Sequence, residues 1–226
     1  MTYMQINELN QNYKTSIMLW LLTLTVMVFL IIIIGGLTRL TDSGLSMVDW
    51  RPILGTLPPF NNNQWLDVFN DYKLTPEFLY VNKNMTLEEF KYIFWWEWFH
   101  RFFARLIGLV FIIPFIYFFV KKNLNSFLYK RFLIIFSLGL LQALVGWWMV
   151  KSGLSEDPYV SPYRLTFHLT NAIIIYALLL WTTIEYYHSK SPNFISFKLK
   201  KDLILISIIL VFITILSVGF MAGSHA

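Results

Sequence analysis

The 226-residue sequence contains no cysteine. Disulfide bonds, thiolate metal sites, iron–sulfur clusters and a cysteine nucleophile are therefore excluded. Any metal ion or cofactor iron must be held by histidine or by oxygen ligands, and the chain has 4 histidines.

Charged residues are also scarce. They make up 14% of the chain, whereas hydrophobic residues make up 57%. A soluble domain carries about 25% charged residues, so this composition is typical of a membrane protein. The net charge of +5 then has to be considered loop by loop, and it gives no reason to expect binding to nucleic acid.

Long apolar runs dominate the rest of the sequence. Five of them reach the length of about 20 residues that a helix needs to cross a bilayer. They cover residues 17–37, 94–120, 132–150, 165–187 and 203–221. The first run is too long for a signal peptide and lacks a small-residue cleavage site. The sequence therefore predicts an all-α, polytopic membrane protein with a four-helix bundle, a fifth helix and a long external loop between the first two spans.

Basic residues are distributed unevenly among the loops. Lysine and arginine gather in loops 121–131 and 188–202, whereas the loop between the third and fourth spans also carries Glu156 and Asp157. By the positive-inside rule, the two basic loops and the N-terminus are cytoplasmic. The long loop 38–93 then lies outside.

The external loop is rich in aromatic residues, so we expect it to be folded. Thr86, followed three residues later by Glu89, is a capping-box signal for a short helix that leads into the second span. The Pro58-Pro59-Phe60-Asn61-Asn62-Asn63 stretch predicts a turn. We expect this loop to cover the outer ends of the helices.

Two histidines, His100 and His168, fall inside predicted spans. His100 lies about six residues into the second span and His168 about five into the fourth, both counted from outside. At the helical rise, both lie roughly 8–9 Å below the outer helix ends. Because these two spans run in the same direction, the topology brings both imidazoles to one level.

This pair of histidines suits a six-coordinate haem iron. Zinc usually takes three or four protein ligands, and Glu97 is the only further candidate nearby. Bis-imidazole ligation from two helices would leave the porphyrin within the apolar bundle. The alternative is that both histidines are buried and bonded to neighbouring backbone. The matched depth and the nearby carboxylate favour axial ligation by His100 and His168.

Glu97 lies three residues before His100 and four before Arg101, so the three side chains share a helix face. Ionisable groups are costly in hydrocarbon and are functional candidates there. Two interpretations remain open: a salt bridge with Arg101, or an acid/base or charge-stabilising group beside the haem.

Arginines collect at the same outer end. Arg39 ends the first span, Arg101 follows His100, and Arg164 lies one turn before His168. Because arginine suits bidentate binding of carboxylates, these three are candidates for binding the haem propionates. For Arg39 and Arg164 the alternative is snorkelling to the outer lipid headgroups.

Several motifs together resemble the haem A synthase family in its alphaproteobacterial and mitochondrial form. The motifs are Gly35-Gly36-Leu37-Thr38-Arg39-Leu40-Thr41 with Gly44-Leu45-Ser46-Met47, Glu97-Trp98-Phe99-His100-Arg101, Gly146 to Leu154, and Ser161 to Leu165 continuing to His168. The bacterial form with a cysteine pair in the first loop is not matched. The resemblance covers nearly the whole chain.

The resemblance implies an oxidoreductase that converts haem O to haem A for cytochrome oxidase, by oxidation of a porphyrin methyl group to a formyl group. It carries the substrate-haem ligands over to His100 and His168 and the catalytic carboxylate to Glu97. It also implies a multi-pass protein of the bacterial inner (plasma) membrane. The partners expected are membrane lipid, haem O and the haem O synthase that supplies it, and no nucleic acid.

Family members consist of two similar four-helix bundles, of which the second holds a haem b. This chain reaches only the fifth span, so we expect a truncated protein, a fragment or a split gene product, completed by a separate C-terminal half or by a second copy. The domains expected are a cytoplasmic tail (1–16), a transmembrane haem-site bundle (17–187) that includes loop 38–93, a basic cytoplasmic loop (188–202) and the start of a second bundle (203–226).

Two other functions remain open. The second hypothesis is a non-catalytic bis-histidine haem protein or b-type cytochrome, and the third is an inactive remnant that binds nothing. An electron carrier has no need of a carboxylate at position 97, so Glu97 discriminates between the second hypothesis and the enzyme.

Overall fold

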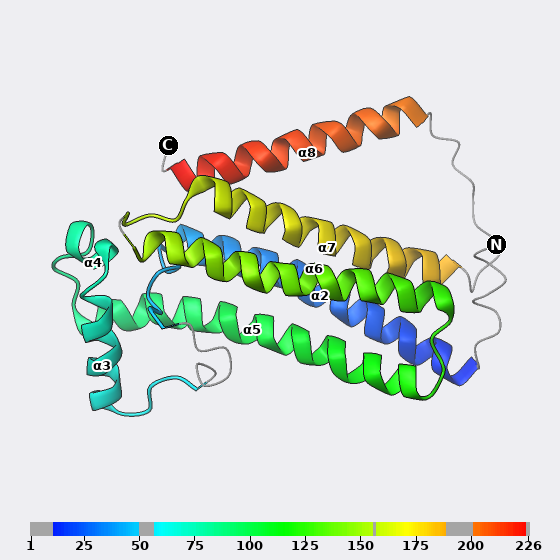
Figure 1. Ribbon diagram of the computed structural model, residues 1–226, viewed down its shortest axis with the longest axis horizontal. Coiled ribbons are helices and arrows are strands. Elements are labelled where there is room, and N and C mark those ends of the chain that lie inside the picture. Colours follow the sequence, from blue (N-terminus) through cyan, green and yellow to red (C-terminus); the bar gives the residue numbers. More distant parts are fainter. Residues whose placement is uncertain (1–10, 50–56, 156, 189–200, 225–226) are drawn as a thin grey trace.

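The computed structural model describes residues 11–49, 57–155, 157–188 and 201–224, and every regular element in these ranges is a helix. Four long helices lie side by side with alternating direction along the chain (Figure 1). They are α2 (Gln11–Leu40), α5 (Leu87–Val120), α6 (Ser126–Gly153) and α7 (Pro162–His188). All four are long and apolar enough to cross a membrane. The predicted all-α membrane architecture is thus confirmed.

The fifth helix, α8 (Lys201–Ser224), lies where the fifth span was predicted and packs along α7 (Figure 1). Among its described side chains, the apolar stretch Ile209–Ser224 is shorter than a full span, so its crossing of the membrane stays a prediction. Residues 1–10 of the expected tail, 189–200 of the expected basic loop, and His225 lie outside the described residues.

The second span begins earlier than its apolar run. The Thr86 side chain accepts the Glu89 N–H and the Glu89 side chain accepts the Thr86 N–H, which confirms the capping box. No helix breaker separates this cap from Phe94, so the expected short helix and the span form one continuous α5. The first two turns of α5 thus project beyond the run 94–120.

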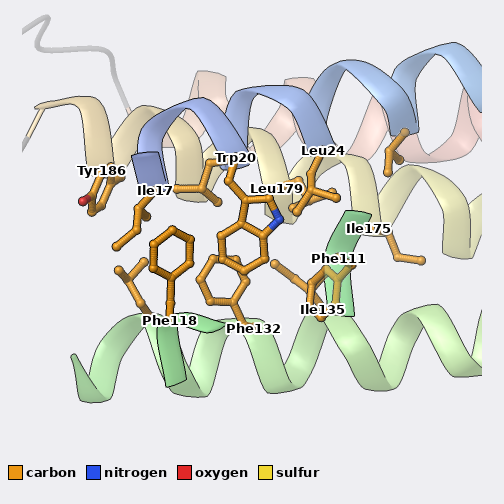
Figure 2. Packing of buried hydrophobic residues seen from close by; sticks show 13 residues of the cluster. Ile17, Trp20, Leu24, Phe111, Phe118, Phe132, Ile135, Ile175, Leu179 and Tyr186 are labelled. Carbon is orange, nitrogen blue, oxygen red and sulfur yellow. The ribbon is translucent and has the colours of Figure 1, made fainter. Parts of the chain in front are cut away.

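The core of the bundle lies toward the end opposite the external loop. Trp20 of α2 packs between aromatic rings of α5 and α6, with ring centroids 4.5 Å from Phe132 and 5.6 Å from Phe118 (Figure 2). The indole N–H of Trp20 donates to the Val110 carbonyl oxygen at 2.8 Å. Because the indole N–H is hydrogen-bonded and the rings are closely packed, this cluster fixes the distance between α2 and α5.

Two glycines spaced one turn apart bring α8 against α7. A Cβ at Gly219 would lie 2.8 Å from Thr166 Oγ1, and a Cβ at Gly223 would lie 2.5 Å from Pro162 Cα. Small residues at this spacing allow close approach of membrane helices. The Arg39 Nε–H also donates to the Ala222 carbonyl at 2.9 Å, which ties α8 to the C-terminal end of α2.

Gly219→Leu is expected to push α8 away from α7, because overpacking a tight contact costs about 1–3 kcal/mol. The chain has no native cysteine, so one introduced pair reports this contact without background. Tyr163→Cys with Phe220→Cys suits the test because the native side chains are in edge-to-face contact, with ring centroids 5.2 Å apart. Gly139→Leu is the control, since nothing lies within 4 Å of a Cβ there. Equal disulfide yields in both backgrounds would contradict the packing assignment.

The loop predicted to be external folds into α3 (Asn62–Tyr72) and α4 (Pro76–Tyr80) at the end of the bundle where α5 begins (Figure 1). The turn predicted over 58–63 is wrong at its end, because Asn61 caps α3 and Asn62 and Asn63 already lie in its first turn. The loop's aromatic side chains form a cluster with the first turns of α5, made of Trp65, Phe69, Tyr72, Phe90, Ile93 and Phe94. The loop therefore has a core of its own, as its aromatic content predicted, and α3 packs on α5.

A buried carboxyl group lies within this loop. Glu77 is buried, and the Tyr72 hydroxyl donates to its Oε2 at 2.9 Å while Asn82 Nδ2 donates to the Tyr72 oxygen at 2.8 Å. Burial raises the pKa of Glu77 to about 7, the carboxylates of Glu97 and Asp42 add to this, and the Tyr72 hydrogen bond and Arg39 oppose it.

We expect the loop to lose stability as the pH rises. Because the folded-state pKa of Glu77 lies above the unfolded value, protonation stabilises the fold at low pH, and this contribution is lost between about pH 4.5 and pH 7. The loss is of the order of 3 kcal/mol by the pKa difference. Hydrogen exchange of the α3 amides, corrected for intrinsic rates, measures it. Glu77→Gln should remove the pH dependence and Glu88→Gln, which changes an exposed carboxylate, should keep it. The same dependence in both variants would rule out Glu77 as its source.

Candidate functional site

His100 lies on α5 and His168 on α7, each in the half of its helix nearer the N-terminal end. Each ring lies against a glycine of a neighbouring helix. A Cβ at Gly35 of α2 would lie 3.4 Å from His100 Nε2, and a Cβ at Gly146 of α6 would lie 2.9 Å from His168 Cε1. All four long helices therefore contribute to the surroundings of the histidine pair.

His168 has a polar partner that the sequence did not identify. Gln142 Nε2 of α6 lies 3.2 Å from His168 Nε2 and also donates to the His168 carbonyl oxygen at 3.2 Å. The Asn171 amide in turn donates to Gln142 Oε1 at 2.7 Å. His168 Nδ1 is buried and has no hydrogen-bond partner. A glutamine in mid-span was a signal for a polar helix contact, although the sequence did not show to what.

Glu97 is buried, with 2% of its surface exposed. Its Oε1 accepts from Arg101 Nη2 at 2.5 Å, so the salt bridge expected as one alternative is present. Its Oε2 accepts from the Ser46 hydroxyl at 2.7 Å and from the Met47 N–H at 2.8 Å. The carboxylate therefore ties the segment after α2 to α5, a contact between residues about fifty positions apart that local spacing could not reveal.

The three arginines predicted to bind propionates all have protein partners. Arg39 pairs with Asp42 at 2.7 Å. Arg101 Nη2 also donates to the Met47 carbonyl at 3.0 Å, while its buried Nη1 has no hydrogen-bond partner. Arg164 donates to the Trp148 carbonyl at 2.8 Å and lies 4.4 Å from the centroid of the Trp148 ring. Arg101 is thus the one of the three with a buried donor atom left over for a ligand.

The residues present fit a haem better than a zinc ion. Among the described residues, no three or more side chains of histidine, cysteine, aspartate or glutamate come together as a metal cluster. Two imidazoles from separate helices, beside glycines that leave room for them, fit the axial ligation of a planar macrocycle. The unpartnered Arg101 Nη1 is a buried donor that a carboxylate of such a ligand can satisfy.

Residues 18–226 match the family model COX15-CtaA, described as cytochrome oxidase assembly protein. The chain belongs to this family. The resemblance seen in the motifs is confirmed, and with four apolar helices of sufficient length, this membership supports a membrane protein.

Curated relatives carry the name heme A synthase. The protein of Nitrosomonas eutropha is 48% identical over 225 residues, covering 97% of this chain and 62% of the relative. That of Nitrosospira multiformis is 47% identical, covering 94% and 60%. That of Parvibaculum lavamentivorans is 42% identical, covering 92% and 60%. The chain thus spans about three fifths of the length of these COX15-CtaA relatives. No solved structure matches it.

Proposed function

We propose that this chain binds haem O between α5 and α7 and takes part in its oxidation to haem A. The observation that carries the proposal is the histidine pair: His100 and His168 come from two parallel helices, and each lies against a glycine of a third or fourth helix. The relatives named heme A synthase support the choice of substrate.

In this proposal the two imidazoles hold the iron of the substrate from its two faces. Arg101, with a buried Nη1 to spare, binds a propionate, and Arg39 and Arg164 at the outer end add positive charge. Arginine is suited to this because its planar fork matches a carboxylate.

Glu97 is the group proposed to act on the reacting methyl. Conversion of a methyl to a formyl group takes up the oxygen of one water and releases four electrons and four protons. A fixed carboxylate can stabilise positive charge that develops on the substrate or accept one of these protons. The Glu97 carboxylate accepts three hydrogen bonds, from Ser46, Met47 and Arg101, which leaves about one of its roughly four lone-pair sites for a proton. The electrons pass to a redox partner, for which the haem b of a second bundle is the candidate.

The setting proposed for this reaction is the bacterial inner membrane, with the N-terminus in the cytoplasm and the site near the outer face. The haem O synthase is the proposed supplier of the substrate. A C-terminal half on another chain, or a second copy of this one, is the proposed source of the haem b bundle.

A cell that makes haem O but no haem A gives a direct test. After expression of the chain there, alone and with the C-terminal half of a relative, the haem is extracted and separated chromatographically. Haem A in either case supports the proposal. Bound haem O without haem A in both cases supports the non-catalytic haem protein instead, an alternative favoured by the contacts of Glu97 with Ser46, Met47 and Arg101, which give the carboxylate a structural role.

A further inference from the structure

The amide orientation of Gln142 is fixed by two backbone carbonyl groups. Asn171 Nδ2 donates to the Leu138 carbonyl at 3.1 Å and to Gln142 Oε1 at 2.7 Å. Gln142 Nε2 donates to the His168 carbonyl at 3.2 Å. Because carbonyl oxygens only accept, both amide nitrogens are assigned, and the Gln142 NH₂ group faces His168.

This orientation also decides which nitrogen of His168 carries the proton. The second N–H of Gln142 points to His168 Nε2 at 3.2 Å, which must accept and is therefore unprotonated. In a neutral imidazole the proton is then on Nδ1. Gln142 thus donates a hydrogen bond to the lone pair on His168 Nε2. A metal ion would need this same lone pair.

Gln142 and Gly146 lie one turn apart on α6, and His168 contacts both of them. A Cβ at Gly146 would lie 2.9 Å from His168 Cε1, so only glycine leaves room for the ring in this position. The imidazole is thus docked on α6, with its Nε2 directed at an amide of α6 instead of at a ligand between α5 and α7.

We propose that Gln142 competes with the haem iron for the Nε2 lone pair of His168 and so makes this axial bond exchangeable. The inference rests on the proposed function and deepens it. A haem that is a substrate must be released after reaction, whereas a permanent cofactor must not. Asn171 keeps the amide turned toward the histidine, and Gln142 is a positioning residue that acts through His168.

Gln142→Leu removes the competing amide and puts an apolar side chain of similar size in its place. Since a net hydrogen bond is worth about 1 kcal/mol, we expect haem to leave the variant about fivefold more slowly than wild type. Haemin is the probe, and transfer to excess apomyoglobin measures its dissociation. The low-spin, bis-imidazole fraction of the optical spectrum should rise in parallel. Asn171→Ala, which frees the amide to turn, should change both quantities in the same direction but less.

Two comparisons make the outcome decisive. Thr25→Val removes another buried mid-bundle hydrogen bond, to Thr183 at 2.9 Å, and should leave haemin dissociation unchanged. In a His168→Ala background, Gln142→Leu should have no effect, because a double-mutant cycle isolates coupling between the two residues. Dissociation as fast as or faster than wild type in Gln142→Leu would overturn the inference. If the wild-type chain and His168→Ala bind haemin equally well, the proposed function is overturned instead.

Discussion

His100→Ala and His168→Ala are each expected to abolish the bis-imidazole haem spectrum and to weaken haem binding more than about 100-fold. Changes to the hydrogen-bond partners of a metal ligand already cost about 10- to 100-fold in affinity, and loss of the ligand itself should cost more. Titration of the purified chain with haemin, followed optically, measures both effects.

The matched control for these variants is His188→Ala, which removes an imidazole from the opposite end of α7. We expect its spectrum and affinity to equal those of wild type. A bis-imidazole spectrum that survives in His100→Ala or His168→Ala would show that another residue ligates the iron.

Glu97→Gln is expected to lower the formation of haem A about 100-fold or more while haem remains bound with an unchanged spectrum. The reason is that glutamine keeps the shape of the side chain but neither carries the charge nor accepts a proton at neutral pH. Haem extracted from cells in which the wild-type chain forms haem A measures the effect.

A structural role for Glu97 predicts a different result. The carboxylate holds Ser46 and Met47 against α5, and its loss leaves the Arg101 charge without its partner. Breaking a buried ion pair costs about 3–5 kcal/mol. Ser46→Ala is the control, because it removes one contact and keeps the charge. Joint loss of folding, haem binding and conversion in Glu97→Gln would assign the residue to structure. Normal haem A yield would remove it from catalysis.

Much of the site could be predicted because its signals are local. His100 and His168 stand out as ionisable groups in apolar runs, and loop charges place them at one level. The Glu97–Arg101 pair follows from a spacing of four residues on a helix. The start of α5 was visible in its capping box, although the apolar run alone placed the span too late.

The rest depends on how helices are rotated against each other. Only the structure shows that imidazoles occupy the space left by Gly35 and Gly146. Likewise, Gln142 needed a partner, but its choice of His168 is set by the facing of α6 and α7. Ser46 and Met47 reach Glu97 through a loop whose path no periodicity encodes.

The most direct test of the central claim is the count of histidine nitrogens bound to the iron. Pulsed electron paramagnetic resonance of haemin bound to the ¹⁵N-histidine-labelled chain gives this count for the low-spin form. We predict two axial imidazole nitrogens in wild type and in His188→Ala, and loss of the low-spin signal in His168→Ala. One or none in wild type would contradict ligation by His100 and His168.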